Sequence, residues 1–154
     1  MKDQRSLQLA GGVALFGLGW LSRDVVWAWR NAPYDWGAGW IALAWAGWVL
    51  WHSWRRGPEP RASWLGAGIV LGLLSWIGEL NAAAHAGLVL AASAWLPLAK
   101  LRVAGVVMGL AWLPAFGWLG SNVVSPVMML AVRGVLLVGV GMICLGLRAK
   151  EDPS

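Results

Sequence analysis

The stretch PYDWGAGWIALAWAGWVLWHSWRR, residues Pro33–Arg56, carries six of the fourteen tryptophans and no charged residue between Asp35 and Arg55. The 19 residues from Trp36 to Trp54 form, at about 1.5 Å per residue, a helix of about 28 Å, which matches a bilayer core of about 30 Å. An arginine pair follows the last tryptophan, as basic residues do on the cytoplasmic side of a membrane helix. The stretch therefore predicts a membrane-spanning helix that runs from outside to inside.

The composition of the whole chain also indicates a membrane protein. Hydrophobic residues make up 59% of the 154 residues and the mean hydropathy is +0.64, so too little polar surface is left to cover a water-soluble domain. The basic residues behind the net charge of +5 lie in short clusters between apolar runs, which argues against a nucleic-acid partner. We expect the partner to be the lipid bilayer, in a bacterial cytoplasmic membrane.

Prolines, glycines and charged clusters divide the chain into six apolar runs. The linker at residues 55–63 holds two prolines and three arginines, and the break at residues 78–81 splits a long apolar region. Pro114 predicts a kink, and Pro126 predicts the first turn of the last helix. The predicted fold is a single all-α transmembrane domain over residues 1–154 with spans at about 7–27, 36–54, 64–79, 82–99, 103–120 and 123–147.

The distribution of basic residues predicts the orientation of these spans. With the N-terminus inside, the inner segments hold nine Lys or Arg residues and the outer loops hold two, Arg23 and Arg30. This bias predicts that both termini are cytoplasmic. Asp24 is expected to neutralise its neighbour Arg23. Tryptophans are expected in two interfacial belts, with Trp20, Trp27, Trp29, Trp36, Trp40, Trp76 and Trp118 outside and Trp51, Trp54 and Trp64 inside.

Arg133 is the polar residue that is most costly to bury without a partner. It lies about ten residues into the last span, where an unpaired guanidinium costs several kcal/mol, so it needs a partner or a water-filled cavity. Other polar residues fall at the same outer depth, and the candidate outward-facing polar cluster comprises Arg133, Glu79, His85, Asn81, Asp35 and Tyr34. Two interpretations stay open: a Glu79–Arg133 pair that only locks helices together, and a functional site.

The remaining candidate residues favour structural roles. His52 and His85 are predicted at opposite membrane faces, so no metal or other cofactor is expected. Cys144 lies in an apolar setting, which favours an inert thiol over a nucleophile. The sequence contains no phosphate-binding glycine loop, Gly-x-Ser-x-Gly or His-Glu-x-x-His motif. These observations favour a protein that is not an enzyme.

Two pairs of small residues predict close helix packing. Gly68 and Gly72 lie four residues apart in the third run, and Gly105 and Gly109 do so in the fifth. Such pairs let helix backbones approach each other in a membrane, either within one chain or in a specific dimer.

The residues Tyr34-Asp35-Trp36-Gly37, with the apolar helix and arginine pair after them, resemble the exosortase/archaeosortase family of membrane sorting enzymes. That family has Tyr-Ser-His-Gly at an outer loop before an apolar helix that ends in Leu-Trp and a basic cluster. The run at residues 85–90 and the basic turn after it are similar to the family's third to fifth helices. Asp35 and Trp36 replace the family's Ser and His, and Cys144 lies at the predicted cytoplasmic end.

The resemblance implies a shortened exosortase without the catalytic Cys, Arg and His portion. Such a protein would assist a protein-sorting or envelope-export system and would have a membrane-protein partner. Two alternatives remain open. One is a small structural subunit of a larger membrane complex, and the other is a transporter or lipid-handling protein that uses the Arg133 cluster as an anion site.

Overall fold

The computed structural model describes residues 2–31, 35, 37–54 and 59–151, and all regular structure among them is helical. The all-α prediction is therefore confirmed for these residues. In chain order the elements are α1 (Lys2–Leu21), α2 (Asp24–Asn31), α3 (Ala38–Trp54), α4 (Ala62–Gly78), α5 (Asn81–Ser93), α6 (Ala99–Gly109), the 3-10 helix η2 (Leu110–Trp112), α7 (Pro114–Ser121) and α8 (Pro126–Glu151).

The helix boundaries follow most of the breaks in the sequence. Glu79 adopts a left-handed conformation with φ 53° at the end of α4, and α5 begins two residues later. At Pro114, which cannot continue the preceding helix because it lacks an N–H, the axis bends by 57°. The predicted kink at Pro114 and helix start at Pro126 are confirmed. The fourth predicted run, 82–99, ends as a helix earlier, at Ser93.

One helix, α8 over Pro126–Cys144, is long and apolar enough to cross a membrane by itself. The number rises to three if each bent pair is one span: α1 with α2, bent by 41°, and α6–η2 with α7, bent by 57°. The helix α4 is apolar but shorter, at 17 residues. By length and composition, the described residues therefore contain between one and three full-length spans.

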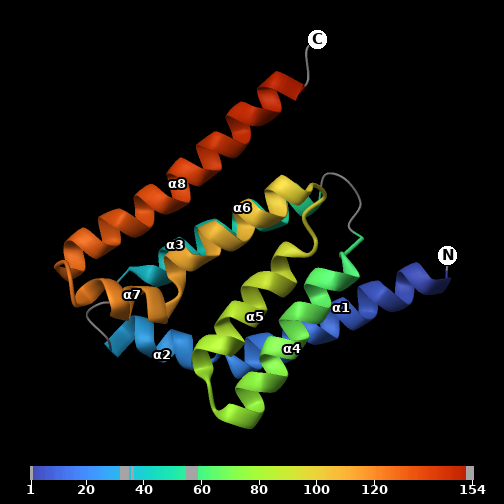
Figure 1. Ribbon diagram of the computed structural model, residues 1–154, viewed down its shortest axis with the longest axis horizontal. Helices are drawn as coiled ribbons and strands as arrows, with labels where there is room; N and C mark the ends of the chain where they lie inside the picture. The colour runs from blue at the N-terminus through green and yellow to red at the C-terminus, as the bar shows by residue number, and fades with distance from the viewer. Residues whose placement is uncertain (1, 32–34, 36, 55–58, 152–154) are drawn as a thin grey trace.

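The helices form two packed groups that share α5 (Figure 1). In one group, α1, α4 and α5 pack together around Leu18, Leu65 and Ala91. In the other, α3, α6, η2 and α8 pack around a core that includes Trp45 and Trp112. Because α5 contacts α1, α4 and α6, it joins the two groups.

Large apolar side chains cover much of the outer surface. Trp40 is 79% exposed, and Trp20, Trp76 and Trp118 are also exposed. Phe16 and many Val, Leu and Ile side chains add to this surface. A water-soluble monomer rarely exposes apolar area on this scale, so the surface is suited to lipid or to another protein.

Glycines bring α4 and α5 into backbone contact. A Cβ atom added at Gly68 would lie 2.7 Å from the carbonyl oxygen of Gly87, and one at Gly87 would lie 2.7 Å from the carbonyl oxygen of Gly68. Gly72 faces Leu18 of α1, while Gly105 and Gly109 of α6 face α5. All four glycines of the two small-residue pairs therefore pack against neighbouring helices of the same chain.

Substitution Gly68→Val should separate α4 from α5, because a new side chain would meet backbone atoms that cannot move aside. We expect the free energy of unfolding to fall by about 1–3 kcal/mol, as for other over-packed cores. Gly66→Val is the matched control on the same helix, since a Cβ there meets no atom within 4 Å. Thermal unfolding in mild detergent measures both, and equal losses would contradict the packing role of Gly68.

Candidate functional site

Arg133 of α8 and Asp35, in the connection between α2 and α3, form an ion pair inside the molecule. Arg133 Nη2 donates a hydrogen bond to Asp35 Oδ1 at 2.8 Å, and both side chains are 0% exposed. The same nitrogen also donates to the carbonyl oxygen of Leu113 at 3.4 Å. Arg133 therefore ties α8 both to the chain entering α3 and to the junction between η2 and α7.

The ion pair does not satisfy every polar atom that it buries. Asp35 Oδ2 and Arg133 Nε and Nη1 have no hydrogen-bond partner among the described residues. Burial raises the pKa of Asp35 above its ordinary value, because the hydrogen bond and charge of Arg133 and the charge of His85 offset only part of the desolvation. The carboxylate thus depends on Arg133 to remain ionised.

A second pair joins α5 to α2. His85 Nε2 lies 3.1 Å from Asp24 Oδ1, with the His85 side chain 4% exposed and that of Asp24 39% exposed. Asp24 occupies the first turn of α2, where the helix dipole also favours a carboxylate. Asp24 begins α2 and Asp35 follows the end of α2, so the two pairs hold the chain at either end of this helix.

The expected neutralisation of Arg23 by Asp24 is wrong. Asp24 contacts His85, whereas the Arg23 guanidinium lies over the Trp20 ring, 4.8 Å from its centroid. Adjacent residues on a helical turn point in different directions, so the two side chains find separate partners.

The structure brings together part of the predicted polar cluster. Asp35 and Arg133 are in contact and His85 is close enough to act on Asp35, but Glu79 and Asn81 are exposed at the α4–α5 turn. Tyr34 lies outside the described residues. The expected Glu79–Arg133 pair is wrong, because Arg133 pairs with Asp35 instead. Glu79 follows α4, which packs on α5 and α1, whereas α8 packs on α6, α3, η2 and α7.

The other residues considered for chemistry are separate from these pairs. His52 is buried, with Nδ1 2.9 Å from the carbonyl oxygen of Trp48 one turn earlier. Cys144 is a free, half-buried thiol in α8. Within the described ranges, no three His, Cys, Asp or Glu side chains are grouped as metal ligands.

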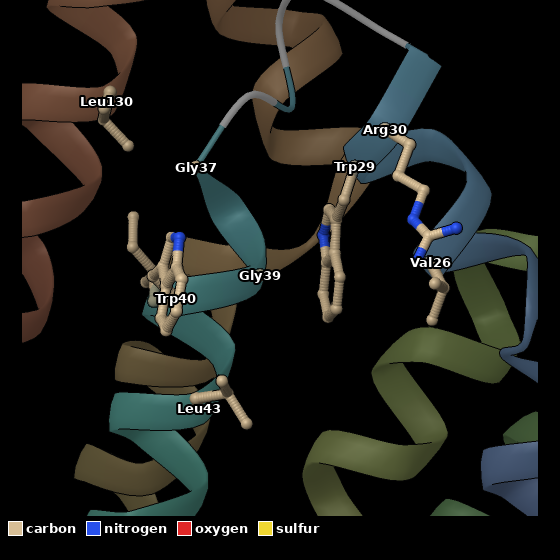
Figure 2. A pocket seen from close by; sticks show the side chains of 9 residues that line it. Val26, Trp29, Arg30, Gly37, Gly39, Trp40, Leu43 and Leu130 are labelled. Carbon is tan, nitrogen blue, oxygen red and sulfur yellow. The ribbon is translucent and has the colours of Figure 1, made fainter.

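A pocket of about 770 Å³ lies between α2 and α3 (Figure 2). Gly37 follows Asp35 by two residues, and Leu130 precedes Arg133 by three, so the ion pair holds two walls of the pocket in place. Leu130 packs directly on Gly37, whose φ of +78° requires glycine. The pocket is lined by Val26, Trp29, Arg30, Gly37, Gly39, Trp40, Ile41, Leu43 and Leu130.

Tryptophans build the core next to this pocket. The sequence did not predict this tryptophan core. Trp45 Nε1 donates to the carbonyl oxygen of Gly105 at 2.7 Å. The Trp112 ring packs at 5.6 Å from Trp45 and at 6.1 Å from Trp29, the latter edge-on. Trp29 was expected in the outer belt, but it is half-buried. The only signal in the sequence was the position of Trp45 in the middle of its run, far from either interface.

Comparisons with protein-family models, curated proteins and solved structures find no match to this chain. The resemblance to exosortases therefore stays a prediction.

Removing either partner of the ion pair should destabilise the protein, but to different extents. Asp35→Asn leaves a buried guanidinium that cannot lose its proton, so we expect a loss of about 3–5 kcal/mol in the free energy of unfolding. Arg133→Met should cost less, because burial already raises the pKa of Asp35 and the carboxyl group can take up a proton. The exposed arginine variant Arg23→Met is the control.

Chemical unfolding in detergent micelles measures these losses. The double variant Asp35→Asn/Arg133→Met should lose less stability than the sum of the single variants, because each single change strands a partner. Additive losses would show that the two side chains do not interact.

Proposed function

We propose that the protein is a multi-pass integral membrane protein of the bacterial cytoplasmic membrane, with six spans and both termini inside. The observation that carries this proposal is the apolar outer surface, on which Phe16, Trp40, Trp76 and Ile77 are each more than half exposed. Surfaces of this kind are stable against lipid acyl chains and unstable against water.

The short helices are compatible with six spans. At about 1.5 Å per residue, the 13 residues of α5 reach only about 20 Å, which is less than a bilayer core of about 30 Å. However, α5 packs against α1, α4 and α6, and residues along its length are buried. Short or broken helices are tolerated at membrane depth where protein rather than lipid surrounds them.

We further propose that the protein is a non-catalytic subunit that assists a protein-sorting or envelope-export system. This part rests on the resemblance of residues 34–37 and of the following helix to exosortases. It is supported by the partners of the possible catalytic groups: His85 contacts Asp24, His52 contacts the Trp48 carbonyl group, and Cys144 has neither histidine as a neighbour within hydrogen-bonding distance.

A structural subunit of a larger membrane complex is the second candidate. It is favoured by the exposed tryptophans, which suit lateral contact with another membrane protein. An anion site at Arg133 has less support, because the Arg133 and Asp35 side chains are fully buried and already bonded to each other.

Cysteine accessibility tests the six-span topology. In a Cys144→Ser background, a cysteine at Asn81 or Asn122 should react with a membrane-impermeant maleimide in intact cells. A cysteine at Arg61 or Lys100 should react only after the membrane is permeabilised, because positive-inside threading places those positions in the cytoplasm. The Cys144→Ser protein alone should remain unlabelled. Labelling at Arg61 in intact cells would contradict the orientation.

Co-purification from membranes in mild detergent tests the role. We expect the tagged full-length protein to retain a sorting, secretion or polysaccharide-export component, and an unrelated tagged six-span protein at the same expression level is the control. Retention of other membrane proteins alone would favour the structural subunit. Purification as a stable single species without partners would contradict both roles.

A further inference from the structure

A smaller cavity of about 240 Å³ lies next to the pocket in Figure 2. Both cavities are lined by Val26, Trp29, Gly39 and Leu43, so they are adjoining parts of one groove between α2 and α3. We call this the α2–α3 groove. The larger, outer part lies within the range of about 300–1,000 Å³ that is usual for small-molecule sites.

The outer part of the α2–α3 groove combines apolar walls with one positive charge. Trp40, Leu43 and Leu130 provide apolar surface, while Arg30 comes from the last turn of α2. Figure 2 shows the Trp29 ring between the α3 backbone at Gly39 and the Arg30 side chain. Arg30 is exposed and has no ion-pair partner among the described residues. An occupant with an apolar chain and an anionic group would match both features.

Three residues that line the inner part of the groove carry buried polar atoms without partners. Ser22 Oγ, Trp29 Nε1 and Trp112 Nε1 have no hydrogen bond within the part of the chain that the structure describes. Ser22 is 5% exposed and Trp112 is 3% exposed. An indole N–H is only a donor, and buried tryptophan N–H groups normally have an acceptor. These atoms are closed to the cavity as well as to solvent, so the inner part offers an apolar surface to a ligand.

We propose that the α2–α3 groove binds one anionic glycerophospholipid of the bilayer. Its phosphate pairs with Arg30, and its acyl chains lie along the apolar walls of both parts. This lipid class is favoured because it carries an anion one glycerol unit away from its apolar chains. The proposal rests on membrane residence as proposed above, but not on the sorting role.

Native mass spectrometry of the full-length protein in detergent tests the charge preference. The probes are phosphatidylglycerol and phosphatidylcholine with identical acyl chains. We expect one phosphatidylglycerol to bind about tenfold more tightly than phosphatidylcholine, and Arg30→Gln to remove most of this preference. Arg23→Gln is the matched control, because it removes the same charge from an exposed arginine that does not line the groove. Equal effects of the two variants, or no preference in the unmodified protein, would overturn the proposal.

Membrane fractionation of the same variants shows separately whether the chain resides in the bilayer.

Discussion

A guanidinium enclosed in an apolar helix bundle needs a partner that offsets its desolvation, and the partner of Arg133 fixes one end of the molecule. Arg133 Nη2 meets Asp35 Oδ1 at 2.8 Å and also reaches the carbonyl group of Leu113. These contacts join α8, the entrance of α3 and the start of α7. Gly37 and Leu130, which flank the pair in sequence, pack on each other and form part of the wall of the α2–α3 groove. The shape of the groove therefore depends on the Asp35–Arg133 pair, although neither residue lines it.

The rest of the bundle depends on the close packing of neighbouring helices against α5. Gly68 and Gly87 allow α4 and α5 to meet at their backbones, and Gly109 receives the Val89 side chain from the other side. Close packing of this kind supplies van der Waals contact where lipid gives no hydrophobic drive. It also leaves little of the α5 surface exposed. The Trp45 hydrogen bond to the Gly105 carbonyl group then links α3 to the same assembly.

Much of the helical framework could be predicted from the sequence, because prolines, glycines and charges mark its breaks. The turn at Glu79, the kink at Pro114 and the start of α8 at Pro126 all follow from local chemistry. The need of Arg133 for a partner was also predictable, but the identity of that partner was not. Sequence position gives the depth of a residue in a span but not the direction in which its side chain points. Glu79 was therefore expected as the partner of Arg133, whereas packing places Asp35 there. Asp24 was assigned to its neighbour in sequence because its spatial partner, His85, comes 61 residues later.

Arg133 and Arg30 both lie near the groove, but they differ in burial and therefore in role. Arg133 is sealed among α3, α8 and the η2–α7 junction, and the chain itself supplies its carboxylate and carbonyl acceptors. Arg30 lines the outer part of the groove and is exposed, so an anion can reach it from outside the chain. A charge that must be satisfied during folding needs a built-in partner, since its desolvation is not otherwise offset. A charge that remains solvated at the end of an apolar groove keeps its capacity to bind, and it gains from binding when the groove also buries the apolar part of the same ligand.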